Sequence, residues 1–200
     1  MIEQAELLGE PAEDPLVLYS VLYGFCVANY VAFDGETVHA AATELLTLAG
    51  RQKATVPLMV GHRFMGICQL HLGALAEARA HLNRAIALYE PKEHRSLATK
   101  YGQDVGTVIS YWRSLTLWLL GYPDAARADA DRALGSARES GHAATSAWAL
   151  SITSLTRICC GDYAAAKTQA DEAAVLADDE GASLWKAVAM RTRVACGAFA

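Results

Sequence analysis

The fold is decided by the stretch from Met65 to Pro91, which reads MGICQLHLGALAEARAHLNRAIALYEP. Gly73 separates two apolar segments in it, and alanines follow that glycine after five and twelve residues. Equivalent glycines recur along the chain at intervals of 38, 48 and 40 residues, at Gly35, Gly73, Gly121 and Gly161. A period of this length is typical of helical-repeat proteins, in which neighbouring helix pairs bury a continuous core.

Alanines accompany these glycines in a fixed pattern. Each glycine has an alanine five residues later, and three of them have another twelve residues later: Ala40, Ala78, Ala126 and Ala166, then Ala85, Ala133 and Ala173. Small residues permit close approach of two helices, so we expect these alanines where the helices of a pair cross. The sequence therefore predicts an all-α fold built from glycine-linked helix pairs.

Composition excludes several classes of protein. The 200 residues are 53% hydrophobic with a net charge of −5, and no basic cluster suggests a nucleic-acid or membrane surface. No stretch approaches the ~20 apolar residues of a membrane span. The start, Met1 to Gln4, is acidic and lacks the positive charge of a secretion leader. Five cysteines without paired spacing favour reduced thiols and a cytoplasmic protein.

Turn signals place the expected helices. They fall at about 15–33, 35–48, 57–72, 75–89, 105–120, 123–140, 143–160, 163–178 and 184–200. The chain is interpreted as a single domain, 1–200, with units at 15–50, 55–91, 105–140, 142–180 and a partial unit at 183–200. Because the last helix has no following mate, we expect the chain to be part of a longer array.

The stretch quoted first resembles the tetratricopeptide (TPR) pattern. Met65-Gly66 stands at its Leu-Gly pair, Gly73 at the turn, Ala78 and Leu82 at its Ala-x3-Phe, and Pro91 near the closing proline. The pattern's tryptophan is absent, and the later units have alanine for the aromatic residue. The resemblance implies a right-handed TPR-like superhelix of about four helix pairs plus a trailing helix.

A second resemblance concerns residues 89–123. YEP at 89–91, HR at 94–95, LA at 97–98, YGQD at 101–104 and LWLLGYP at 117–123 resemble the C-terminal TPR-like region of large bacterial signalling proteins. Those proteins join a class III nucleotidyl cyclase, or another effector, to an AAA/STAND-type ATPase. The resemblance implies the sensor or regulatory arm of such a protein, with attached ATPase or effector domains as partners. It carries over no catalytic residue.

Residues 90–104 form the one long connection, which is expected to be functional or a short extra helical turn. Its polar side chains are His94, Arg95, Tyr101, Gln103 and Asp104. Two interpretations stay open. His94, Arg95 and Asp104 pair with each other, or Asp104 caps the next helix; alternatively, the five residues line a ligand or partner site.

The first helix of each pair is expected to line the concave face. In the best-fitting register this face carries Arg63, Ile67, Tyr111 and Trp118, residue types that include those enriched in binding hot spots. Arg63 and Tyr111 are expected at the surface, whereas Trp118 fits either the groove or the core between repeats. Val60, Ser151 and Leu155 share the face in this register.

Nothing in the sequence specifies catalysis, a metal site or a cofactor. No phosphate-binding glycine loop is present, and the six histidines lack metal-ligand spacing. Asp129/Asp131 and the acidic run 178–180 are interpreted as solvated surface. His71 and His81 flank a turn and could meet, although surface positions are expected for both.

The sequence is compatible with three alternative functions. The first is non-catalytic binding of a protein segment or a small effector in the concave groove. The alternative is self-association into a homodimer, because the final helix is uncovered and the first is strongly apolar, with Leu16, Val17, Leu18, Val21 and Leu22. The third is an enzyme that uses a cleft at 90–104, which predicts converging ionisable groups with shifted pKa values.

Overall fold

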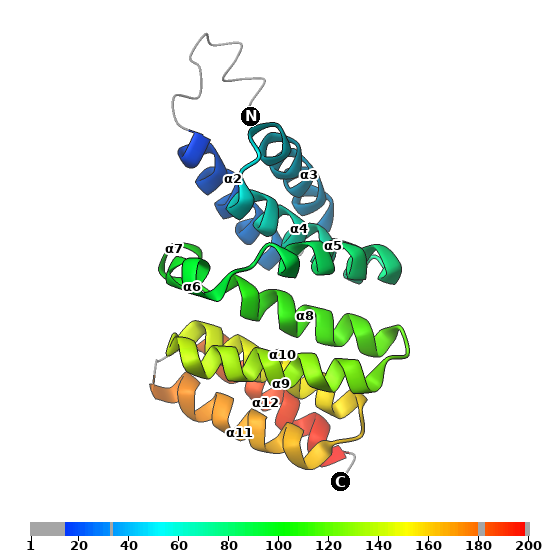
Figure 1. Ribbon diagram of the computed structural model, residues 1–200. Helices are drawn as coiled ribbons and strands as arrows, with labels where there is room; N and C mark the ends of the chain where they lie inside the picture. Colours follow the sequence, from blue (N-terminus) through cyan, green and yellow to red (C-terminus); the bar gives the residue numbers. More distant parts are fainter. Residues whose placement is uncertain (1–14, 33, 180–182, 199–200) are drawn as a thin grey trace.

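The computed structural model describes residues 15–32, 34–179 and 183–198, and within these ranges the secondary structure is helical, without strands (Figure 1). The elements are α2 (Pro15–Val31), α3 (Gly35–Gln52), α4 (Thr55–His71), α5 (Leu75–Ala87), α6 (Pro91–His94), the 3-10 helix η1 (Arg95–Leu97), α7 (Ala98–Tyr101), α8 (Val105–Leu119), α9 (Pro123–Ser140), α10 (Ala143–Cys159), α11 (Tyr163–Asp179) and α12 (Ser183–Ala198). The all-α prediction is confirmed. No helix in these ranges has both the length and the apolar character needed to cross a bilayer.

The long helices stack in chain order. The first helices of the pairs, α2, α4, α8, α10 and α12, each contact the next one along the chain. The second helices, α3, α5, α9 and α11, each pack between the first helix of their own pair and that of the following pair. Figure 1 shows this progression from α2 and α3 at one end to α11 and α12 at the other. The arrangement is that of a helical repeat, with hairpins added side by side.

Three of the four repeat turns have the same backbone chemistry. Gly73, Gly121 and Gly161 have φ values of 79°, 85° and 76°, a left-handed region that glycine enters without steric cost. In each turn the glycine N–H binds the carbonyl three residues earlier, and the following N–H binds the carbonyl five residues earlier. This is the Schellman motif, which satisfies the last carbonyls of a helix. The turn before Gly35 differs, because Asp34 caps α3 by accepting the N–H of Thr37.

The predicted helix crossings are tightly packed. Six of the repeat alanines have no exposed surface: Ala78, Ala85, Ala126, Ala133, Ala166 and Ala173. Ala40 is exposed, so the first unit departs from the pattern. At Gly66 a Cβ atom would lie 2.7 Å from the side chain of Leu82, which explains why α4 and α5 approach so closely there.

Helix ends differ slightly from the prediction. α3 continues to Gln52, four residues beyond the expected end, and α5 stops at Ala87, short of the expected Tyr89. The connection 90–104 folds into α6, η1 and α7, which agrees with the expectation of extra helical turns and accounts for the 48-residue interval. Cys26 and Cys68 are buried free thiols. The side chains of Cys196, Leu16 and Val17 lie outside the described residues.

Candidate functional site

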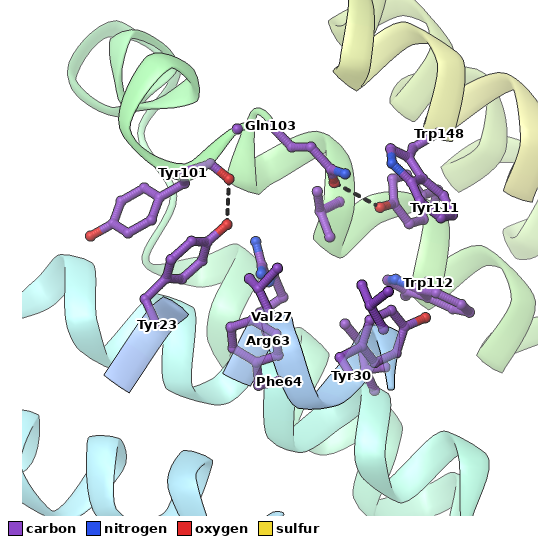
Figure 2. A pocket seen from close by; sticks show the side chains of 14 residues that line it. Tyr23, Val27, Tyr30, Arg63, Phe64, Tyr101, Gln103, Tyr111, Trp112 and Trp148 are labelled. Carbon is purple, nitrogen blue, oxygen red and sulfur yellow. Dashed lines mark hydrogen bonds between the residues drawn. The ribbon is translucent and has the colours of Figure 1, made fainter. Parts of the chain in front are cut away.

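A cavity of about 300 Å³ lies on the side of the stack formed by the first helices (Figure 2). Side chains from α2, α4, α8 and α10 form its walls, and residues 101–103, at the end of the 90–104 connection, complete it. Helices far apart in the chain therefore meet at this point.

Arg63 is the charged residue of the cavity. It lies on α4 between Val60 and Ile67, three and four residues away, so that the three share one helix face. Its side chain is only 5% exposed, and its guanidinium carbon lies 4.2 Å from the ring centre of Phe64 and 5.4 Å from that of Tyr23. Figure 2 shows the guanidinium directed toward the space below Tyr101 and Gln103.

The charge of Arg63 has no ion-pair or hydrogen-bond partner among the described residues. It makes no ion pair or hydrogen bond with them, and its Nε is fully enclosed without an acceptor. Burying a charged group costs several kcal/mol when it is unpaired. The two cation–π contacts return about 0.5–2 kcal/mol each. The protein alone thus leaves this charge incompletely compensated.

Helix α2 supplies an aromatic wall. Tyr23, Val27 and Tyr30 are spaced by four and three residues, so they line up on one face of the helix and reach the cavity together. The ring centre of Tyr30 lies 6.5 Å from that of Trp112, in an edge-to-face arrangement. Such aromatic pairs add about 0.5–1.5 kcal/mol beyond area burial. This wall is therefore held by its contacts across the cavity.

Helices α8 and α10 supply the opposite wall. Val108, Tyr111 and Trp112 come from α8, and Trp148 comes from α10. The ring centres of Tyr111 and Trp112 are 5.7 Å apart. Together with the α2 side chains they make the lining predominantly aromatic and aliphatic, as is usual for small-molecule sites.

Two hydrogen bonds attach the 101–103 segment to these walls (Figure 2). The Tyr23 hydroxyl donates to the backbone carbonyl of Tyr101. The Tyr111 hydroxyl donates to Oε1 of Gln103 over 3.1 Å. The connection between the second and third helix pairs is therefore part of the site, because one bond reaches α2 and the other reaches α8.

Three cavity phenols, those of Tyr30, Tyr101 and Tyr111, keep their protons. Burial raises the pKa of Tyr30 to about 12 and also raises the pKa of Tyr101 and Tyr111, while the Arg63 charge opposes the increase in each case. The phenols are consequently neutral hydrogen-bonding groups at physiological pH. Among the described residues that line the cavity, Arg63 alone carries a formal charge.

Five of the predicted site residues meet in this cavity. Arg63, Ile67 and Tyr111 were expected in the groove and Tyr101 and Gln103 in the connection, and the structure joins the two groups. The expectation that Arg63 and Tyr111 lie at the surface is wrong, since they are only 5% and 3% exposed. The physical reason is the closure of α2 and the 101–103 segment over them.

The other candidates lie elsewhere. Trp118 is half-buried near the end of α8 and does not line the cavity. His94 is buried, and its Nδ1 accepts the N–H of Glu90. Arg95 forms an ion pair with Glu139 at 2.8 Å, so the expected pairing with Asp104 is wrong.

Asp104 is a structural anchor. Its side chain is fully buried and caps α8 by accepting the N–H of Thr107 over 2.7 Å, as one of the two interpretations predicted. Its other oxygen accepts the Tyr89 hydroxyl over 2.7 Å, and its own N–H donates to Thr145 Oγ1 on α10 over 2.9 Å. Asp104 thereby fixes Gln103, its neighbour in the chain, against the cavity.

A further expectation about polar residues needs correction. Asp129 is 3% exposed and bonds to Arg113 and Arg132, so it is not part of a solvated face. His71 is exposed, as expected, whereas His81 is half-buried and meets His62, with their Nδ1 atoms 3.0 Å apart. Within the described ranges no group of three or more His, Cys, Asp or Glu side chains is placed to hold a metal ion.

Sequence reasoning missed five of the aromatic residues that line the cavity. These are Tyr23, Tyr30, Phe64, Trp112 and Trp148. The spacing of Tyr23, Val27 and Tyr30 carried a usable signal, because it marks one aromatic helix face. Trp112 and Trp148 had no comparable signal, since their orientation depends on how the helix pairs rotate against one another.

Neither the protein-family models nor the curated proteins compared with this chain give a match.

Proposed function

We propose that this chain is a non-catalytic binding domain that takes a protein segment or a small effector into the cavity around Arg63. The observation that carries the proposal is the buried guanidinium, which has no partner among the described residues and faces an aromatic cavity. An unpaired buried charge is costly, and a ligand that pairs with it would offset that cost. A TPR-like, right-handed superhelix is the framework we propose for this site, in a cytoplasmic protein.

The cavity lining favours binding over catalysis. Of the residues described there, none is a carboxylate, histidine or cysteine, the groups that most often serve as general acid, general base or nucleophile. Burial raises the pKa of Tyr30 and Tyr111, so both phenols stay protonated near neutral pH and are not available as bases. The 90–104 connection is likewise occupied by internal contacts of His94, Arg95 and Asp104.

The resemblance of residues 89–123 to bacterial signalling proteins supports a regulatory role. We propose that the chain belongs to the sensor arm of a larger ATPase or nucleotidyl cyclase. Ligand binding would act on attached domains if the ligand has different affinities for two arrangements of the helix stack, because only such a difference shifts an equilibrium. The 101–103 segment is suited to this role, since it links the second and third helix pairs at the cavity.

A fragment screen tests the proposal. Ligand-observed NMR with a library of acids, bases and neutral compounds, plus short peptides, would be run on the parent chain. The variant Val31→Trp blocks the cavity from a lining position that is 58% exposed, and Leu72→Trp adds the same bulk at a 72% exposed position outside it. We expect binders that lose at least ~10-fold in affinity with Val31→Trp and keep it with Leu72→Trp. The proposal is contradicted if no compound binds the parent chain, or if Val31→Trp leaves the affinity of the binders unchanged.

Self-association is the second candidate, favoured by exposed apolar side chains on the last two helices. Val175, Met190 and Val194 are 61%, 54% and 73% exposed. On α2, Val21 and Phe25 are also exposed, whereas Leu22 is buried. Light scattering over a dilution series tests it: a dimer that Val194→Glu dissociates supports the idea, and a monomer at every concentration removes it.

A further inference from the structure

We infer that the occupant of the cavity is a small aromatic monocarboxylate, whose carboxylate pairs with Arg63 and whose ring lies among the aromatic walls. The inference rests on the proposed binding function and narrows it to one ligand chemistry. Four properties of the cavity carry it: its charge, the orientation of the guanidinium, the nature of the walls and the size.

Charge comes first. The described lining holds one positive group, Arg63, and no acidic side chain. A monoanion therefore neutralises the site, whereas a phosphate monoester brings nearly two negative charges and leaves one of them buried without a partner. A cationic ligand would place like charges together in an apolar environment. Neutral ligands would leave the guanidinium as it is.

The guanidinium can meet a planar, two-oxygen partner. Its central carbon lies over the rings of Phe64 and Tyr23, 4.2 and 5.4 Å from their centres. Nε is enclosed by protein, which leaves the two terminal Nη groups to meet a ligand. A carboxylate can accept two parallel N–H bonds from that edge, the strongest geometry available to arginine.

The walls favour a ligand with a flat, apolar ring. Tyr30, Trp112 and Trp148 present rings, and Val27 and Val108 fill the space between them with aliphatic groups. Aromatic rings pair favourably with one another in offset or edge-to-face contacts. Gln103 adds specificity, because its Oε1 is taken by Tyr111 and its amide N–H groups remain to donate to a ligand oxygen.

The size favours a small molecule over a peptide. A volume of about 300 Å³ is at the lower end of the range for small-molecule sites. Because walls from four helices and the 101–103 segment surround this space, a compact ligand fits, whereas an extended chain needs an open groove. Arg63 is 5% exposed, so the group that pairs with it must enter the cavity.

Calorimetry on the full 200-residue chain tests this with matched probes. The series is 2-naphthoate, its neutral amide, 2-naphthylmethylamine, 2-naphthyl phosphate and an acetylated peptide, Gly-Ser-Gly-Phe, with a free carboxylate. We expect 2-naphthoate to bind at least ~10-fold more tightly than the amide, a difference of about 1.4 kcal/mol. The amine, the phosphate and the peptide should all bind more weakly than 2-naphthoate.

Variants assign the preference to Arg63. Arg63→Met should abolish the difference between acid and amide while the amide still binds, and Arg63→Lys should reduce it because the two-pronged geometry is lost. Arg79→Met is the matched control, since Arg79 also lies over an aromatic ring, that of Tyr122 at 5.0 Å, outside the cavity. It should leave the preference unchanged.

The results distinguish a wrong carboxylate assignment from a wrong binding function. If the amide binds as tightly as the acid, or the phosphate or peptide binds best, the carboxylate assignment is overturned and the binding function stands. If no probe binds the parent chain, the assignment is overturned as well. The fragment screen with Val31→Trp then decides independently whether the cavity binds any ligand.

Discussion

The hydroxyl of Tyr89 donates a hydrogen bond to Oδ2 of Asp104, and the two oxygens are 2.7 Å apart. Tyr89 follows the last turn of α5 and Asp104 immediately precedes α8, so this bond joins the two ends of the 90–104 connection. Asp104 has no exposed surface, which makes the bond a buried one. The pair therefore holds the connection closed and keeps Tyr101 and Gln103 at the cavity.

Removal of the Asp104 carboxylate should cost more than removal of an ordinary helix cap. Asp104→Ala loses the cap of α8 and leaves the Tyr89 hydroxyl without its buried partner, so we expect a loss of about 2–4 kcal/mol in the free energy of unfolding. The matched control is Asp34→Ala, which removes an exposed cap with the same bonds to a threonine three residues later and should cost clearly less. Urea unfolding measures both. Equal losses would contradict the role of Tyr89.

Gly106 is expected to resist substitution although it lies in a helix. A Cβ atom there would lie 2.4 Å from the Tyr89 ring, so Gly106→Ala should destabilise the fold by about 1–3 kcal/mol through overpacking. Gly135 in α9 has open space around the same atom, and Gly135→Ala should stabilise by about 0.5–1 kcal/mol. Thermal unfolding of the two variants compares them. A stabilised Gly106→Ala would show that the Tyr89 ring moves freely.

Arg63 should reduce stability in the absence of ligand. Because its buried charge has no partner, we expect Arg63→Met to raise the free energy of unfolding by about 1–3 kcal/mol. Arg113→Met provides the contrast: Arg113 is paired with the buried Asp129, and its loss should destabilise by roughly 2–4 kcal/mol. Denaturant titration of the ligand-free proteins measures both. A destabilised Arg63→Met would mean that the cation–π contacts outweigh the cost of burial.

The histidine pair predicts a pH dependence. Burial, with the nearby charges of His81 and Arg84, lowers the pKa of His62 to about 4 from its usual 6.5, and burial lowers that of His81 too, with Arg84 and His39 adding to it. Between pH 4 and pH 6.5 the unfolded chain therefore binds more protons than the folded chain. The contribution of these histidines to stability is complete above pH 6.5 and falls toward pH 4.

A variant isolates the contribution of His62. His62→Gln should flatten the decline between pH 6.5 and 4 by on the order of 1–2 kcal/mol, a value reduced for solvent screening because the side chain is only partly buried. Unfolding free energies at a series of pH values compare the parent chain with His62→Gln. Parallel curves for parent and His62→Gln would refute the assignment.

Local sequence rules predicted the repeats because those rules act within one helix pair. Gly73 and Ala78 are specified by a turn and a crossing only a few residues apart, and both behave as predicted. Asp104 as a cap is equally local. Features of this kind need no knowledge of how distant helices pack.

The cavity depends on packing between helices that are far apart in the chain, which local sequence patterns do not reveal. Arg63 was expected at the surface because the repeat register places it on the concave face, and it is buried because α2 and the 101–103 segment close over it. Trp112 lines the cavity and Trp118 does not, although both lie on α8, because the helices that form the cavity meet only one part of α8. Such choices follow from the rotation between neighbouring pairs, which no local pattern encodes.

The cavity draws its walls from the first helices of four successive hairpins. A molecule that touches all four at once fixes the angles between them, so the width of the site and the bend of the stack change together. Ligand binding in this one cavity would therefore set the curvature of much of the helix stack. A domain attached to the stack would change its orientation as a consequence.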